Sequence, residues 1–309
     1  MAAIDCRSHN PSGQETLNMK LFALLLGVLL AGCAVQTRDD APQALAPAQP
    51  WPEPDSHCTN GNVLLDAHFE TGNLGHCEPS TDGRFLLTMF PEDDPPINHS
   101  AWYAFRVSGT PGSTVDIRME FDHGYARYWP KISRNGSDWQ AMNEEWVAIG
   151  KEKEWMEISL PLDQARLWVA GQEITASRFY ENWLTELADR DGVSTRLLGQ
   201  SVEGRPIYLA QTHDRPEFVL LMGRQHPPEI TGAIGMYTFM ETVFADNELA
   251  RRFRARFQLG IVPLVNPDGV AGGHWRHNIN GVDVNRDWGP FTQPESQAVI
   301  RWIEQQEAN

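Results

Sequence analysis

The stretch Phe218–Glu229, with the sequence FVLLMGRQHPPE, decides the fold and contains the first functional residues. Phe218–Met222 is a short apolar run, which is typical of a strand that is covered on both faces of a sheet. Gly223 ends the run, and His226 and Glu229 follow three residues apart. Open α/β sheets bind ligands beyond the carboxyl ends of such strands. The stretch therefore predicts an α/β domain with an imidazole and a carboxylate at one edge of its sheet.

The segments around this strand alternate between helical and strand patterns. Strand patterns occupy residues 207–212 and 257–265, and helical patterns occupy residues 175–190, 229–244, 249–256 and 294–303. Thr175 is a suitable N-cap for the first helix, and Pro294 fits the first position of the last one. This alternation predicts an α/β domain over residues 171–309, with a mixed sheet and helices on both faces.

Residues 58–170 have a different pattern. Short runs of alternating apolar and polar residues are separated by turn pairs such as Pro111-Gly112 and Asn135-Gly136. This pattern predicts an all-β antiparallel sandwich. Most of the eleven tryptophans lie between Trp102 and Trp183. They fit either the core and turns of the sandwich or an aromatic platform that binds sugars.

The N-terminal region predicts export. Met19 is the better start, so we expect residues 1–18 to be a mis-called start and residues 19–33 to be a signal peptide, with a ten-residue apolar run from Leu21 to Leu30. Leu30–Cys33 resembles a bacterial lipobox, which would place a lipid on Cys33 and anchor the protein to the outer membrane in the periplasm. An ordinary secretory cleavage site or a buried helix is the alternative. Residues 34–57, rich in Ala, Pro and Gln, are expected to be a linker.

Two further cysteines, Cys58 and Cys77, lie within the predicted sandwich. They form either a disulfide, as an oxidising compartment would favour, or two buried thiols. The net charge of −16 argues against nucleic acid or an anionic membrane surface as a partner. The expected membrane contact is therefore through the lipid anchor only.

His226 and Glu229 are residue types that bind zinc, although His-x-x-Glu alone is also common as a loop hydrogen bond. Three motifs follow them along the chain: Asn266–Gly269, Trp275-Arg276 and Gly281–Arg286. Arginine suits a carboxylate or an oxyanion because its planar fork donates two hydrogen bonds and stays charged. This order of residues indicates a site that holds a peptide carboxylate beside a metal ion.

In this order, the motifs resemble those of the zinc carboxypeptidase family, and most closely its cytosolic-carboxypeptidase-like branch. Leu198–Ile207 (LGQSVEGRPI) is similar to the start of the family's catalytic domain. Phe69–Leu74 (FETGNL) and Tyr128–Trp139 (YWPKISRNGSDW) resemble the β-sandwich that precedes the domain in that branch. The resemblance implies metal-assisted hydrolysis of the C-terminal peptide bond of peptides or proteins, with one Zn²⁺ per active site.

The resemblance also implies a role for each matched residue. His226 and Glu229 would be zinc ligands. Asp283 would not bind the metal but would support His226, fixing the orientation of its ring. Arg276 would polarise the scissile carbonyl. Asn285 and Arg286 would hold the terminal carboxylate of the substrate.

We expect this sequence to be truncated at its C-terminus, so that the family's third zinc ligand and its catalytic glutamate lie beyond residue 309. His274 and His277, which flank Arg276, are interpreted as loop residues and not as the third ligand. The alternative is a non-catalytic binding module of the cell envelope, in which the peptidase domain is a relic. The side-chain preference for the substrate is not predicted.

Overall fold

The computed structural model describes residues 54–93, 97 and 99–307, which lie in one compact unit. The expected signal peptide, the lipobox with Cys33 and most of the expected linker lie outside the described residues. Within those residues, no helix has both the length and the apolar character needed to cross a membrane.

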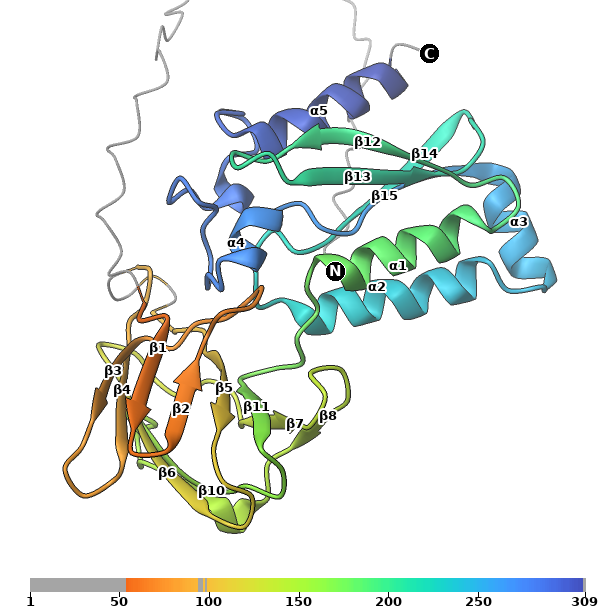
Figure 1. Ribbon diagram of the computed structural model, residues 1–309. Helices are drawn as coiled ribbons and strands as arrows, with labels where there is room; N and C mark the ends of the chain where they lie inside the picture. Colours follow the sequence, from red (N-terminus) through yellow and green to blue (C-terminus); the bar gives the residue numbers. More distant parts are fainter. Residues whose placement is uncertain (1–53, 94–96, 98, 308–309) are drawn as a thin grey trace, which may run out of the picture. The chain divides into compact units, whose positions relative to one another are not determined.

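The N-terminal part is a sandwich of two sheets (Figure 1). The first sheet contains, in spatial order, β1 (His57–Asn60), β2 (Val63–Asp66), β5 (Ala104–Ser108), β11 (Arg166–Ala170), β7 (Lys131–Ser133) and β8 (Trp139–Ala141). The second contains β3 (His76–Pro79), β4 (Phe85–Met89), β6 (Thr114–Phe121), β10 (Trp155–Pro161) and β9 (Val147–Ile149), with the short 3-10 helix η1 (Glu144–Trp146) before β9. Alternate residues of β6 are buried, which gives the sandwich its apolar core.

The strands of the sandwich are not all antiparallel. β4 and β6 pair in parallel, whereas the other described strand pairs of the two sheets are antiparallel. The parallel pair arises because the chain leaves β4, forms β5 in the opposite sheet and then returns as β6. Cys58 in β1 and Cys77 in β3 form a disulfide, with Cα atoms 6.0 Å apart, that joins the two sheets.

The α/β domain has a four-stranded mixed sheet. Its spatial order is β12 (Ser194–Gln200), β13 (Pro206–Gln211), β15 (Phe257–Val262) and β14 (Glu217–Met222), with β14 and β15 parallel and the other pairs antiparallel. The helices are α1 (Ser177–Ala188), α2 (Ile230–Val243), α3 (Glu248–Arg256), α4 (Pro267–Ala271) and α5 (Pro294–Glu307), and η2 (Val284–Arg286) is a 3-10 helix.

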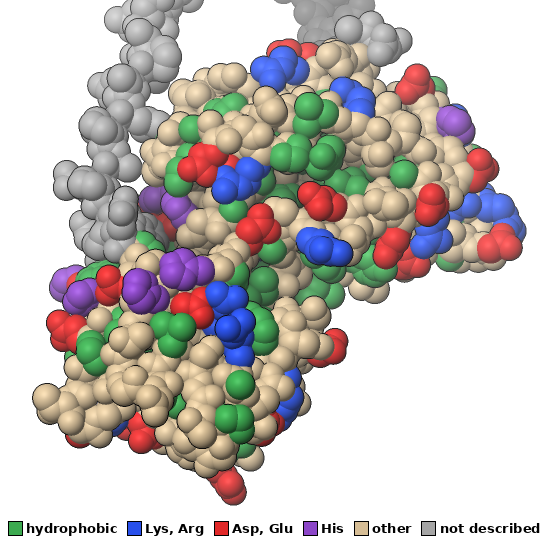
Figure 2. Space-filling view, in the orientation of Figure 1, with side chains coloured by type: hydrophobic (Ala, Val, Ile, Leu, Met, Phe, Trp, Pro, Cys, Tyr) green, Lys and Arg blue, Asp and Glu red, His purple; other side chains and the backbone are tan. Residues whose placement is uncertain are grey.

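Helices cover both faces of this sheet, as the sequence predicts (Figure 1). Side chains of α1 and α2 pack against one face, and α5 packs against the other through Trp302. A Cβ at Gly260 of β15 would lie 2.4 Å from the indole of Trp302, so only glycine lets the ring pack this close. On the face drawn in Figure 2, acidic side chains are interspersed with basic ones.

One local expectation is wrong. Thr175 is not the N-cap of α1, which begins at Ser177. Instead, the carboxylate of Glu70 in the sandwich accepts hydrogen bonds from the backbone N–H of Ser177 (3.0 Å) and its hydroxyl (2.8 Å). Asp268 lies in the short helix α4, where the side chain of Asn266 caps the first turn.

Candidate active site

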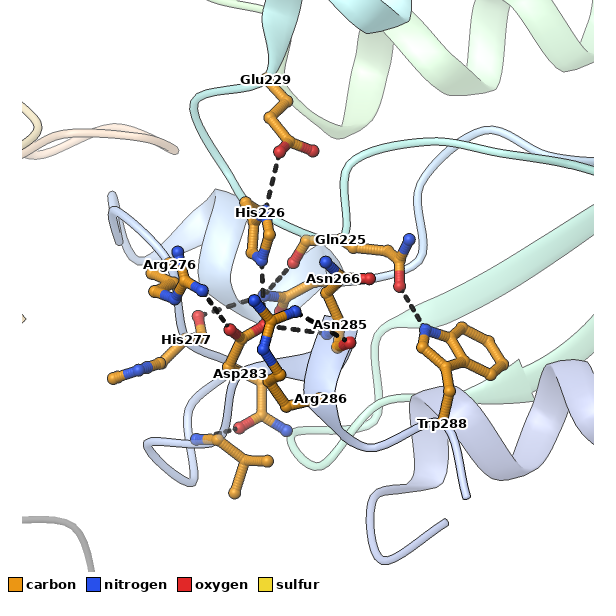
Figure 3. Close-up of polar contacts among 12 residues, drawn as sticks. Gln225, His226, Glu229, Asn266, Arg276, His277, Asp283, Asn285, Arg286 and Trp288 are labelled. Atoms are coloured by element: carbon orange, nitrogen blue, oxygen red, sulfur yellow. Dashed lines mark hydrogen bonds and ion pairs between the residues drawn. The ribbon is translucent and has the colours of Figure 1, made fainter. Parts of the chain in front are cut away.

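His226 and Glu229 lie on the connection from β14 to α2, and their side chains meet (Figure 3). Proline at 227 and 228 delays the helix, so Glu229 occupies the N-cap position of α2 and does not cap it with its side chain. His226 Nδ1 therefore lies 2.7 Å from Glu229 Oε1. Glu229 is 55% exposed, which leaves this pair open to solvent on one side.

The second ring nitrogen of His226 contacts Asp283, which connects the functional motifs. His226 Nε2 lies 2.9 Å from Asp283 Oδ1, and the same oxygen accepts a hydrogen bond of 2.9 Å from the backbone N–H of Asn285. Asp283 Oδ2 lies 2.6 Å from Nη2 of Arg276. One carboxylate thus holds the imidazole, the start of η2 and the first arginine together (Figure 3).

This arrangement changes the acidity of both partners. Burial alone would lower the pKa of His226, but its hydrogen bonds to Asp283 and Glu229 outweigh burial and raise the pKa to about 9. Burial would raise the pKa of Asp283, but the hydrogen bond and charge of His226 and the charge of Arg276 lower it to about 2. Both shifts favour a protonated imidazole between two ionised carboxylates.

The pair of His226 and Glu229 fits two ligands of a zinc ion. Nδ1 of His226 and a carboxylate oxygen of Glu229 face each other on the exposed side. Asp283 contacts Nε2 on the other side of the ring, which is how a carboxylate that does not bind the metal orients a metal-binding histidine. A metal ion would have to displace the proton from Nδ1. Among residues 54–93, 97 and 99–307, no three His, Cys, Asp or Glu side chains are arranged to hold a metal ion.

The two predicted arginines have different surroundings. Arg276 is 12% exposed and lies between two carboxylates, Asp283 at 2.6 Å and Asp93 of the sandwich at 3.6 Å. Arg286 and Asn285, on η2, are exposed. Nη1 of Arg286 donates a long hydrogen bond of 3.4 Å to the carbonyl of Asn285, and within the described residues Arg286 forms no ion pair. Arg286 is therefore the arginine whose fork is available to an incoming carboxylate.

The loop that carries Arg276 is held by residues that sequence reasoning missed. The side-chain amide of Asn266 donates to the carbonyl of Gln225 (3.2 Å) and to that of His277 (3.1 Å), so it joins this loop to the His226 turn. Glu92 of the sandwich accepts hydrogen bonds from three successive backbone N–H groups of the same loop. Asn266 belongs to the motif Asn266–Gly269, whereas Glu92 lies in an acidic, proline-rich stretch that gives no local signal.

Comparisons with known proteins cover both domains. A family model described as zinc carboxypeptidase matches residues 180–309, and one described as cytosolic carboxypeptidase N-terminal domain matches residues 65–171. Cytosolic carboxypeptidase 2 of Xenopus tropicalis is 31% identical over 263 residues, which are 74% of this chain and 27% of the relative. Cytosolic carboxypeptidase 6 of Mus musculus is 25% identical over 274 residues, which are 79% of this chain and 50% of the relative.

The chain thus spans half or less of the length of these two curated relatives. Among solved structures, a metallo-carboxypeptidase from Pseudomonas aeruginosa superposes with a TM-score of 0.65 at 23% identity, over 78% of this chain and 66% of that one. This likeness shows that both share a fold. Together with the two matched domain models, it confirms the resemblance on which the sequence interpretation rests. Residues 180–309 therefore belong to a zinc carboxypeptidase domain, and residues 65–171 to the N-terminal domain of the cytosolic carboxypeptidases.

Proposed function

We propose that this chain supplies two zinc ligands and the substrate-carboxylate clamp of a carboxypeptidase that removes C-terminal residues from peptides or proteins. The observation that carries the proposal is the position of His226, whose two ring nitrogens contact Glu229 and Asp283. An ordinary loop hydrogen bond would explain the first contact. It would not explain why the second nitrogen is bound by the carboxylate that also holds Arg276 and the N-terminus of η2.

His226 and Glu229 would hold the zinc ion, which supplies Lewis-acid chemistry for hydrolysis when it is bound. Asp283 fixes the orientation of the His226 ring and keeps the proton on Nε2. The family resemblance also implies a third ligand and a glutamate that takes the proton from water, and among the described residues no third ligand stands beside this pair. The protein to test is therefore the complete gene product.

The remaining motifs would bind and orient the substrate. Arg286 and Asn285 are exposed beside the His226 cluster and would hold the terminal carboxylate. Arg276 would stabilise the oxyanion that forms on the scissile carbonyl. In the structure its Nη2 faces Asp283 and its Nε faces Asp93, so substrate would have to share this guanidinium with those carboxylates.

The experiment compares two peptides that differ only at the C-terminus, one a free carboxylate and the other an amide. The full-length gene product is expected to release single C-terminal residues from the free peptide, to leave the amidated peptide intact, and to lose activity when a zinc chelator is added. Binding of envelope glycans or proteins without hydrolysis of either peptide would instead support the binding-module alternative.

We also propose that the protein is exported to the periplasm and anchored by a lipid on Cys33, as the N-terminal sequence predicts. The uncharged Ala34 at the next position is expected to direct it to the outer membrane. Cys33→Ser should release the protein into the soluble periplasmic fraction, as measured by immunoblotting of membrane and soluble fractions. A variant that sediments with membranes in the same proportion as the parent would rule out the lipid anchor.

A further inference from the structure

Glu92 lies in the loop after β4 of the sandwich, yet its side chain contacts a loop of the α/β domain. Its carboxylate has no exposed surface. Oε1 accepts a hydrogen bond of 2.6 Å from the backbone N–H of Trp275. Oε2 accepts hydrogen bonds of 2.7 Å from the N–H groups of Arg276 and His277. One carboxylate thus binds three consecutive peptide units on the loop that carries the predicted oxyanion arginine.

These contacts suit an ionised carboxylate in particular, because it has acceptor sites on both oxygens and no donor. Titratable side chains of the loop, and Asp93 next to Glu92 in sequence, lie around this carboxylate. The imidazole of His274 lies 3.5 Å from Oε1, that of His277 lies 3.6 Å from Oε2, and Asp93 bridges His277 (3.2 Å) and Arg276 (3.6 Å).

Holding a loop with a buried carboxylate costs free energy, because the charged group loses its contact with water. Burial raises the pKa of Glu92 to about 7, although the charge of His277 and the three backbone N–H groups act against this rise. Loops can be fixed at lower cost by neutral side chains, as Asn266 does for His277 on the same loop. The charged group therefore indicates that the exact position of the loop matters as well as its stability.

The position in question is that of Arg276. Its backbone N–H is the central one of the three that Glu92 binds, and its Nη2 reaches Asp283, which in turn contacts His226. Glu92 is thus connected to His226 through Arg276 and Asp283. An error of about 1 Å in the placement of a catalytic group can cost on the order of 10²-fold in rate.

Building on the proposed function, we propose that Glu92 is a positioning residue for carboxypeptidase catalysis, by which the N-terminal domain sets the place of Arg276 in the active site. The sandwich is then a part of the catalytic unit and not a separate binding module. Glu92 acts through the loop and does not touch the substrate.

The first test measures amide hydrogen exchange of the Arg276 loop in the full-length protein with Glu92→Gln. Glutamine keeps the size of the side chain but replaces one acceptor oxygen with a donor. We expect the Trp275, Arg276 and His277 amides to exchange at least about tenfold faster, because an exposed or poorly paired N–H opens more often. Unchanged protection of these three amides would overturn the proposal.

Glu70→Gln is the matched control. Glu70 is also a sandwich carboxylate that accepts two hydrogen bonds from the α/β domain, but it binds Ser177 at the start of α1. It should leave exchange of the 275–277 amides unchanged. If Glu92→Gln does not fold, Glu92→Asp retains the charge on a shorter side chain and should show a smaller increase in exchange at the same three amides. Equal protection in that variant and the parent would count against the proposal.

The second test separates positioning from general stability. Glu92→Gln should lower kcat by up to about 10²-fold with KM little changed. In an Arg276→Ala background the same substitution should lower kcat less than about twofold, because the group it positions is gone. Equal losses in both backgrounds would show that Glu92 is only structural. A parent without peptidase activity would refute the proposed function. Hydrogen exchange would then still decide whether Glu92 fixes the loop that carries Arg276.

Discussion

The two sides of the candidate active site are built in different ways. The His226 side comes from one strand end and the turn that follows it, so that the interacting pair is three residues apart in sequence. The Arg276 side is fixed by Glu92, which is 184 residues away from Arg276 and belongs to the other domain. The first kind of site can be recognised as a motif, whereas the second exists only after the two domains pack. This difference makes the two arginines and Glu92 the informative residues to change.

The largest effect among them is expected at Arg276. Arg276→Ala should lower kcat and kcat/KM together, by about 10²–10³-fold, because the guanidinium stabilises charge that develops only in the transition state. Arg276→Lys should rescue poorly, since a point charge cannot reproduce the planar fork. Steady-state kinetics on one free-carboxylate peptide would measure both. A variant that loses only substrate affinity, with kcat intact, would make Arg276 a second carboxylate clamp.

A different kinetic signature is expected at Arg286. Arg286→Ala should mainly raise KM, because an exposed arginine that binds the terminal carboxylate does so in the ground and transition states alike. The variant should also discriminate less against the amidated peptide. The ratio of kcat/KM for the free and amidated peptides measures this effect. An unchanged ratio would remove Arg286 from the substrate site.

A third effect is expected in the pH dependence of stability. The folded-state pKa of Glu92, about 7, lies above the ordinary value of 4.5. A raised pKa means that the contribution of this group is fully present below about pH 4.5 and is lost as pH rises through about 7. The free energy of unfolding of the parent, minus that of Glu92→Gln, should therefore fall by roughly 3 kcal/mol between pH 4.5 and pH 8. Urea unfolding at several pH values measures this difference, and a flat difference would show that Glu92 is not held in a desolvated state.

Much of the α/β domain could be predicted because its signals are local. The apolar run Phe218–Met222 is β14 without its first residue, and the helix expected over residues 229–244 is α2, Ile230–Val243. The strand expected over residues 257–265 is shorter, because it ends at Val262 before Pro263, which has no N–H for the ladder. The contact of His226 with Asp283 is the one that the family resemblance implies.

The remainder depends on partners that are distant in sequence. The parallel pairing of β4 with β6 depends on which sheet receives β5, and short alternating strands do not specify this. The helix α1 begins at Ser177 because Glu70, 107 residues earlier, caps it. Glu92 was missed for the same reason, since its position in the acidic stretch Pro91–Asp93 suggests only a solvated loop.

The zinc content of the full-length protein, measured by elemental analysis in the parent and in His226→Ala, tests the central claim most directly. The parent is expected to contain one zinc ion per chain. The variant should fall well below one and should lose turnover, because it lacks one of three protein ligands. Equal zinc stoichiometry in the two proteins would contradict the assignment of His226 as a ligand, and with it a zinc site at the end of β14.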